Sequence, residues 1–225
     1  MHQKDIVYFS YNSQKELDIN ATKFIIKKAS LSIKNSGSFS LVLSGGTTPV
    51  NVYKLLAKEK INFEKWHIYF GDERCFPLNH PERNSYVAQS IWLSKVNIPK
   101  ANIFIIPAEA GNEEAATLYE KVLDSEKAFD LVILGMGDDG HIASLFPNQK
   151  WDDSRQVNPI KDAPKSPSDR VSLTPSRLSN SDEVLFLIAG KNKLNAFNQY
   201  KDEGNLPANL ISAKNKISVM TFDLI

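Results

Sequence analysis

Residues 39–58 read FSLVLSGGTTPVNVYKLLAK, and this stretch indicates the fold class of the chain. Its first five residues are apolar apart from one serine, which is typical of a strand buried on both faces of a sheet. Two glycines follow, and Pro49 suits the first position of a helix that Thr48 can cap. The stretch therefore predicts a strand over 39–43, a tight turn and a helix over 49–58.

The same alternation recurs along the rest of the chain. Short apolar runs predict strands and amphipathic stretches predict helices between them. The expected strands cover residues 6–9, 66–70, 103–106, 130–134, 170–174, 183–189 and 217–222, and the expected helices cover 13–33, 84–94, 113–127 and 191–200. The prolines and polar residues of 147–167 predict a long loop near 148–168 instead of a packed element. We therefore expect an α/β protein with a mostly parallel sheet and a single domain over 1–225.

The composition excludes several classes of function. Lys and Arg number 27 against 26 Asp and Glu, which gives a net charge of +1 and argues against a nucleic-acid or membrane-surface partner. No apolar run approaches the ~20 residues that cross a bilayer, and the first residues lack the apolar segment of a signal peptide. The single Cys75 excludes an intramolecular disulfide and a multi-cysteine zinc site. We expect a cytoplasmic protein, monomeric or weakly homo-oligomeric, with a small-molecule substrate and no cofactor.

Four polar clusters directly follow predicted strands, and open parallel sheets bind ligands beyond the carboxyl ends of their strands. The clusters are residues 44–48 (SGGTT), 71–74 (GDER), 135–141 (GMGDDGH) and 190–193 (GKNK). In the first, Ser44, Gly45, Gly46 and Thr47 lead into a helix, whose free amides and dipole favour a phosphate. Because the Gly-Lys-[Ser/Thr] ending of a P-loop is missing, a simple phosphate ester is favoured over a nucleoside triphosphate. The alternative is a tight turn that binds no ligand.

The 135–141 cluster predicts a catalytic loop. It matches the G-x-G-x-x-G pattern of dinucleotide-binding folds, but Pro147 interrupts the long helix that such folds require. His141 is the candidate general base, because the ordinary pKa of histidine lies near neutral pH. Either Asp138 or Asp139 could fix its tautomer. The alternative interpretation is a structural or merely exposed histidine.

Each of the remaining polar candidates has a structural interpretation as well as a functional one. Asp72 and Arg74 belong either to a substrate site or to a local ion-pair cluster. Lys193 stands in the first turn of a predicted helix, where the helix dipole disfavours a cation, so a bound anion would explain it. A solvated lysine is the alternative. The four histidines show no H-E-x-x-H spacing, which gives little support to a metal site.

Three motifs together resemble the 6-phosphogluconolactonase family. They are residues 44–49 (SGGTTP), 71–77 (GDERCFP) and 135–147 (GMGDDGHIASLFP), and the similarity continues through 163–165 (APK), 170–174 (RVSLT) and 190–193 (GKNK). The resemblance implies the wider sugar-phosphate isomerase and deaminase superfamily and a Rossmann-like three-layer α/β/α fold. It also implies metal-independent hydrolysis of 6-phospho-D-glucono-1,5-lactone to 6-phospho-D-gluconate in the oxidative pentose phosphate pathway.

The resemblance also implies roles for individual residues. The implied phosphate loop and its cations are Gly45, Gly46, Thr47, Arg170 and Lys193, the implied base is His141, and the implied substrate-site residues are Asp72, Arg74 and Asn84. The family commonly has Ser-Asn where this chain has Arg83-Asn84. Arg170 stands at the start of its predicted strand and not after its carboxyl end, so either that strand runs antiparallel or the preceding loop folds back over the site.

Two rival functions suit the same fold. One is a glucosamine-6-phosphate deaminase or related isomerase, and the other is a non-catalytic sugar-phosphate sensor, which would not need His141. In the deaminase relatives, Gly-His-Ile-Ala continues into Phe-Asn-Glu-Pro, and that glutamate assists opening of the sugar ring. This chain has Phe146 at that position, and a phenyl ring cannot carry a proton. The relatives read Met-Asp-Glu-Tyr around Asp72, whereas this chain has an arginine, Arg74. Both differences favour the lactonase.

Overall fold

The computed structural model describes residues 5–123 and 127–224. Within these residues, seven strands form one sheet in the order β1-β10-β9-β6-β2-β3-β5. The strands are β1 (Ile6–Tyr11), β2 (Phe39–Leu43), β3 (Trp66–Phe70), β5 (Ile103–Phe104), β6 (Phe129–Leu134), β9 (Ser181–Ala189) and β10 (Lys216–Phe222). Each neighbouring pair in this sheet runs parallel. The predicted α/β class and mostly parallel central sheet are confirmed.

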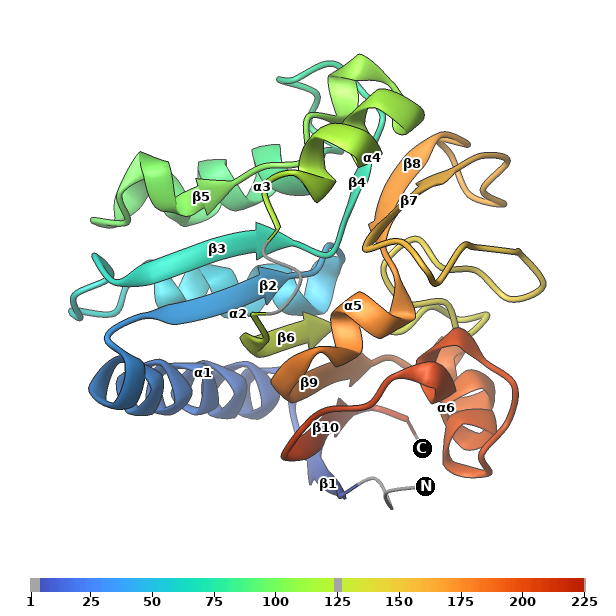
Figure 1. Ribbon diagram of the computed structural model, residues 1–225. Helices are drawn as coiled ribbons and strands as arrows, with labels where there is room; N and C mark the ends of the chain where they lie inside the picture. Colours follow the sequence, from blue (N-terminus) through green and yellow to red (C-terminus); the bar gives the residue numbers. More distant parts are fainter. Residues whose placement is uncertain (1–4, 124–126, 225) are drawn as a thin grey trace.

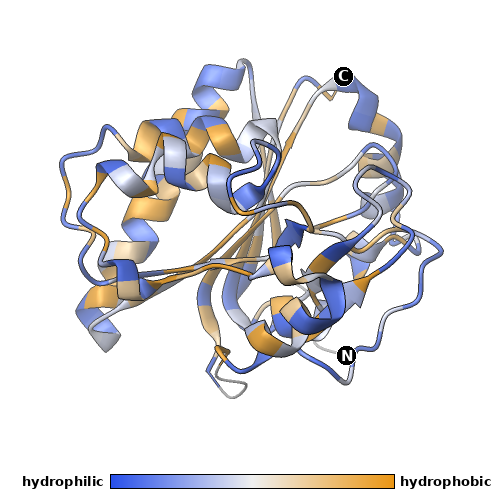
Figure 2. Ribbon diagram, turned by 90° about the horizontal axis from the view of Figure 1, so that it is seen from above, coloured by the Kyte–Doolittle hydropathy of each residue, from blue (hydrophilic) through white to orange (hydrophobic). Residues whose placement is uncertain are grey.

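Helices cover both faces of this sheet (Figure 2). They are α1 (Gln14–Ser36), α2 (Thr47–Leu56), α3 (Asn84–Ile91), α4 (Asn112–Glu120), α5 (Pro175–Ser179) and α6 (Leu194–Lys201). Short 3-10 turns cover η1 (Leu93–Lys95), η2 (Lys100–Asn102), η3 (Ala108–Ala110), η4 (Lys191–Lys193) and η5 (Pro207–Leu210). Since α1 packs beside α2 and α2 beside α3, these three form one outer layer. The three-layer α/β/α arrangement is confirmed.

Helix α1 shows how the sequence sets these layers. Leu17, Ala21 and Ile25 recur at helical spacing and are fully buried against the sheet. Ser13 begins the helix by accepting a hydrogen bond from the Glu16 amide at 3.1 Å. Gly37 ends it with a φ of 84°, a left-handed conformation that glycine adopts without strain. Both ends are therefore encoded locally.

A second, antiparallel sheet lies beyond the carboxyl ends of β2 and β3 (Figure 1). It consists of β4 (Asp72–Arg74), β8 (Arg170–Leu173) and β7 (Val157–Ile160) in the order β4-β8-β7. Arg74 pairs with Arg170 in its register. Of the two placements that the sequence left open for Arg170, the antiparallel strand is the one found.

The prediction of a loop without packed structure over 148–168 is wrong at β7. The side chain of Glu120 accepts hydrogen bonds from the amides of Gln156 and Val157, at 2.9 and 3.3 Å. Asn112 donates to the carbonyl of Ile160 at 3.0 Å. Both partners lie on α4, so this strand depends on contacts about 40 residues away in sequence. A proline inside a four-residue strand hid it from a local pattern.

Other predicted boundaries differ by a few residues. Helix α2 begins at Thr47 and not at Pro49, and its N-cap is Gly46 with a φ of 97°, so the proposed cap Thr48 lies inside the helix. Helix α4 ends at Glu120, and residues 124–126 of that predicted helix lie outside the described residues. The other expected helices keep their places, although 84–94 and 191–200 each include a 3-10 turn. Within residues 5–123 and 127–224, no helix is both long and apolar enough to cross a membrane.

Candidate functional site

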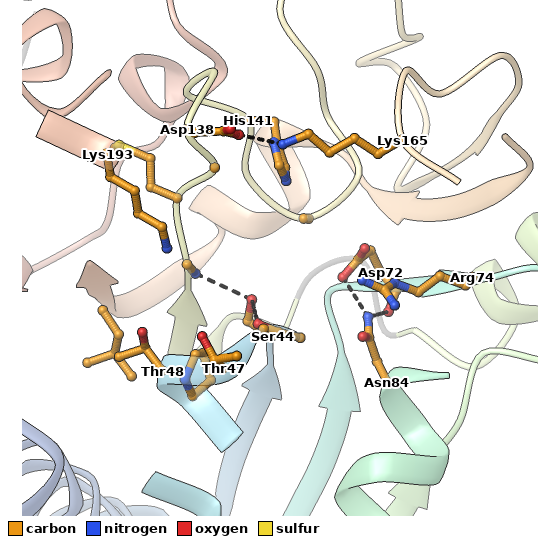
Figure 3. A pocket seen from close by; sticks show the side chains of 18 of the residues that line it. Ser44, Thr47, Thr48, Asp72, Arg74, Asn84, Asp138, His141, Lys165 and Lys193 are labelled. Atoms are coloured by element: carbon orange, nitrogen blue, oxygen red, sulfur yellow. Dashed lines mark hydrogen bonds and ion pairs between the residues drawn. The ribbon is translucent and has the colours of Figure 1, made fainter. Parts of the chain in front are cut away.

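A cavity of about 380 Å³ opens between the carboxyl ends of the central strands and the small sheet. Its volume lies within the range of small-molecule sites. Its lining includes every site residue predicted from the sequence: Ser44, Gly45, Gly46, Thr47, Asp72, Arg74, Asn84, Asp138, His141, Arg170 and Lys193. Figure 3 labels eight of these residues, from Ser44 to Lys193, and shows that their side chains come from different elements. The fold therefore gathers all the candidates in one place.

The loop between β2 and α2 forms one wall of the cavity. Tyr53 fixes Ser44, because its hydroxyl donates to the Ser44 carbonyl at 2.9 Å and accepts from the Ser44 amide at 3.0 Å. No side chain caps the first turn of α2 after Gly46. A Cβ on Gly45 would lie 2.2 Å from Oδ1 of Asn84, so this position requires glycine. Uncapped amides at a helix N-terminus beside a cavity have the geometry that suits an anion.

Asp72 joins three parts of the site. Its Oδ1 accepts from Nδ2 of Asn84 at 3.0 Å, and its Oδ2 accepts from the Ser144 hydroxyl at 2.6 Å. Asn84 also donates to the Asp72 carbonyl at 3.0 Å. Because Asp72 is almost fully buried, these bonds replace its lost hydration. The contacts fix β4, α3 and the 135–147 loop relative to one another.

Glu73 and Arg83 support this arrangement from the core. Glu73 accepts hydrogen bonds from the amides of Asn84 and Ser85, at 2.7 and 2.8 Å, at the start of α3. Burial raises the pKa of Glu73 despite these bonds. Arg83 is fully buried and donates to Glu109 at 2.6 Å, and its Nε lies 3.6 Å from Glu73. Arg83, where the sequence resemblance implies a serine, thus has a structural role.

His141 forms the opposite wall and is held by Asp139. Nδ1 of the imidazole lies 2.5 Å from Oδ1 of Asp139, and the His141 amide donates to the same oxygen at 3.2 Å. Burial lowers the pKa of His141 below its ordinary value, and the charge of Asp139 opposes this shift without cancelling it. At neutral pH the ring is therefore neutral. With the Nδ1 proton on the carboxylate side, Nε2 is free to accept a proton.

Of the two carboxylates left open by the sequence, Asp139 is the partner of His141. Asp138 instead pairs with Lys165, whose Nζ lies 2.5 Å from its Oδ1. Asp138 lines the cavity, but it is not the group that orients the imidazole. The interpretation of Asp138 as that catalytic partner is corrected accordingly. Residues 138 and 139 are adjacent, and only the turn geometry decides which one faces the ring.

Lys193 and Arg170 bring positive charge to the cavity in different ways. Figure 3 shows Lys193 extending into the cavity toward Thr47. Burial lowers the pKa of Lys193, while the charge of Asp138 acts in the opposite direction. Arg170 is buried, and it uses Nε and Nη2 on three carbonyl groups, those of residues 165, 166 and 167, each at 3.0 Å. Arg170 therefore also orders the segment before its strand.

Comparison with known proteins shows to which family the chain belongs. Residues 12–220 match the family described as Glucosamine-6-phosphate isomerases/6-phosphogluconolactonase. The chain belongs to this family. The 6-phosphogluconolactonase of Nostoc sp. is 35% identical over 83% of this chain and 81% of the relative. The corresponding sequence from Thermotoga maritima is 32% identical over 95% and 96%. The crystal structure of 6-phosphogluconolactonase from Thermotoga maritima superposes with a TM-score of 0.87, at 30% identity, over 97% of this chain and 100% of that one. The resemblance drawn from the sequence is confirmed.

Some of the residues that form the site were not predicted from the sequence. Lys165 and Asn192 also line the cavity, and the Ser144 hydroxyl bonds to Asp72 behind it. The family-like APK motif at 163–165 was the only signal for Lys165, and it gave no geometric reason for a role. Within residues 5–123 and 127–224, no group of three or more His, Cys, Asp and Glu side chains is arranged to hold a metal ion.

Phe146 stands at the position for which the sequence resemblance implies a glutamate in deaminase relatives. The ring is fully buried, its centroid lies 4.6 Å from that of His141, and the Arg170 guanidinium lies 5.4 Å away over its face. An apolar ring beside the imidazole contributes to the desolvation of His141. This side of the site therefore has packing surface in place of a second proton-transfer group.

Proposed function

We propose that this protein is a 6-phosphogluconolactonase, which hydrolyses 6-phospho-D-glucono-1,5-lactone to 6-phospho-D-gluconate in the oxidative pentose phosphate pathway. One observation carries the proposal. His141, which Asp139 holds through Nδ1, lines the same cavity as the uncapped start of α2 and Lys193. One wall can accept a proton, and the other can bind a phosphate. Similarity to named 6-phosphogluconolactonases along most of the chain supports the same activity.

In this proposal the substrate phosphate binds at the start of α2. The amides of Gly45, Gly46 and Thr47 donate to phosphate oxygens, and Lys193 supplies a full positive charge. Arg170 adds a second charge at the cavity wall and keeps residues 165–167 in place. Binding energy from this remote phosphate orients the lactone carbonyl toward His141.

The chemical step follows from the neutral imidazole. Nε2 of His141 accepts a proton from water as the water oxygen bonds to C1 of the lactone, and the carbonyl electron pair moves onto its oxygen. Arg74 supplies positive charge for that developing oxyanion. When the carbonyl re-forms, the bond from C1 to the ring oxygen breaks, and the imidazolium returns its proton to that oxygen. The product acid then ionises, so one proton is released for each turnover.

Asp139 and Asp72 assist without taking the proton. Asp139 holds the Nδ1 proton and stabilises the imidazolium during the step. Asp72 accepts from Asn84 and Ser144, which keeps the walls of the cavity at a fixed separation. The active form thus needs a neutral His141 and an ionised Asp139, whose pKa, despite its partial burial, is lowered by its contact with His141.

A glucosamine-6-phosphate deaminase is the second candidate, because the family includes that activity. The buried Phe146 beside His141 argues against it, since the position offers no group to protonate the ring oxygen of an amino sugar. Arg74 suits an anionic or oxyanionic species better than a neutral enol.

The deciding experiment offers both substrates to the purified protein. We expect acid release from 6-phosphogluconolactone above the spontaneous rate, and neither ammonia nor fructose 6-phosphate from glucosamine 6-phosphate. His141→Ala, prepared in parallel, controls for spontaneous hydrolysis and for contaminating enzyme. Ammonia release that is lost in His141→Ala, with lactone hydrolysis at background, would establish the deaminase instead. Substrate binding without turnover of either compound would indicate a sensor.

A further inference from the structure

The backbone of Lys165 is held in place by buried groups. Arg170, itself almost fully buried, donates Nη2 to the carbonyls of Lys165 and Ser166 and Nε to that of Pro167, each at 3.0 Å. The amide of Ala163 donates to the carbonyl of Ser168 at 2.9 Å and closes the turn. Although the Lys165 side chain is half-exposed, its attachment point at the cavity mouth is therefore fixed.

The ammonium group of Lys165 lies between two carboxylates beside the catalytic histidine. Nζ is 2.5 Å from Oδ1 of Asp138 and 3.9 Å from Oδ2 of Asp139. The other oxygen of Asp139, Oδ1, contacts Nδ1 and the amide of His141. Lys165 and His141 thus share one carboxylate, each on its own oxygen.

Another lysine of the same segment provides a contrast. Lys161 pairs with Glu113 at 2.9 Å, with both side chains 62% exposed, and it does not line the cavity. An exposed pair of this kind contributes little to stability or to the site. The two lysines lie four residues apart, yet only Lys165 is directed to the acidic pair of the catalytic loop.

Four charged groups act on the imidazole of His141: Asp138 and Asp139 from its own loop, Lys165 from the turn over 163–168, and Asp72 from β4. The ring of Phe146 covers another side. The aspartates favour protonation of the ring, which would remove the base, whereas Lys165 and burial disfavour it. A base that must stay neutral near several carboxylates benefits from a nearby cation.

We propose that Lys165 is a positioning residue for His141: it fixes Asp138 and Asp139 so that Asp139 keeps Nδ1 of the imidazole, and it offsets the negative charge beside the ring. The role of His141 in this statement rests on the proposed function. Lys165 itself takes no part in proton transfer.

The test compares Lys165→Met, Lys165→Arg and the matched control Lys161→Met with the unchanged protein. The first measurement follows the imidazole signals of His141 by NMR across pH, without substrate. We expect Lys165→Met to raise the pKa of His141, because a cation that opposed protonation is gone. Lys165→Arg should restore the original titration, and Lys161→Met should not move it. Backbone amide spectra check that each variant is folded.

The second measurement is the pH profile of kcat/KM for lactone hydrolysis. In Lys165→Met the acidic limb should move to higher pH, and kcat on the plateau should fall roughly tenfold, part of the 10²- to 10⁴-fold contribution of a positioned base. An unchanged titration and an unchanged profile would overturn the proposal. So would a rise in KM alone, which would make Lys165 a direct substrate ligand. Because the NMR titration needs no substrate, absence of lactonase activity in the unchanged protein would reject the proposed function without deciding the titration result.

Discussion

The loop between β2 and α2 and the 135–147 loop face each other across the cavity, but they offer different groups to a ligand. The first presents backbone amides at Gly45, Gly46 and Thr47, and nothing in it titrates near neutral pH. The second presents the imidazole of His141, whose Nδ1 makes a short hydrogen-bonded contact with Asp139. A wall built from backbone depends on the path of the chain, whereas a wall built from charged side chains depends on pH and on neighbouring charges. The two walls should therefore respond to different perturbations.

The largest effect should come from removing the imidazole of His141 from the second wall. We expect His141→Ala to lower kcat by about 10²- to 10⁴-fold, the usual contribution of a positioned general base, with a smaller change in KM. Steady-state kinetics on the lactone, corrected for spontaneous hydrolysis, measures both values. His67→Ala, a change in β3 outside the cavity lining, is the control. A variant that keeps its kcat would show that another group activates the water.

The next effect concerns the shape of the first wall. In Gly45→Ala the new Cβ would lie 2.2 Å from Oδ1 of Asn84, which two hydrogen bonds hold against Asp72. Either the loop or Asn84 must move, and misplacement of about 1 Å can cost roughly 10²-fold in kcat/KM. Overpacking should also destabilise the fold by about 1–3 kcal/mol.

Gly135→Ala is the matched control for that change, because its Cβ would meet nothing closer than 3.8 Å. Thermal unfolding and kinetics of the two variants separate a steric effect from a general intolerance of alanine near the cavity. If Gly45→Ala unfolds and turns over like the unchanged protein, the wall does not depend on that close approach.

Removal of the positive charge of Lys193, which lies beside the first wall, should have a smaller effect. Lys193→Ala should weaken binding of the phosphate by roughly 1.5–3 kcal/mol, the range of a charge-assisted hydrogen bond, and should raise KM more than it lowers kcat. Inhibition by 6-phosphogluconate should weaken in parallel. An unchanged KM together with unchanged product inhibition would place the phosphate elsewhere in the cavity.

The two walls also differ in how far the sequence could predict them. The stretch 39–49 carries its own signals: an apolar strand, two glycines and a proline for the helix start. Each signal is local, because steric and capping preferences act over a few residues. The fold class and the glycine loop could therefore be predicted, even though the helix begins two residues earlier than expected.

The second wall depends on contacts between residues far apart in the chain. Asp72 bonds to Ser144, and Lys165 bonds to Asp138. Arg170 could be named as a cation, but the antiparallel pairing of its strand with β4 joins residues far apart in the chain, and no local pattern encodes it. Which of two adjacent aspartates faces His141 was equally undetermined, because a single turn decides it.

The smallest expected effect comes from substitutions that test which of the two adjacent aspartates orients His141. Asp139→Asn removes a negative charge that favours protonation of the ring, so the pKa of His141 should fall and the acidic limb of kcat/KM should move to lower pH. The asparagine can also place its amide N–H toward Nδ1, which selects the wrong tautomer and should lower plateau kcat roughly tenfold. Asp138→Asn is the matched control, because Asp138 pairs with Lys165 and not with the ring. Its acidic limb should move less and its kcat should fall less. If the Asp138 variant shows the larger displacement, then Asp138 orients His141 in solution, and the contact between Asp139 and Nδ1 is not the one that supports catalysis.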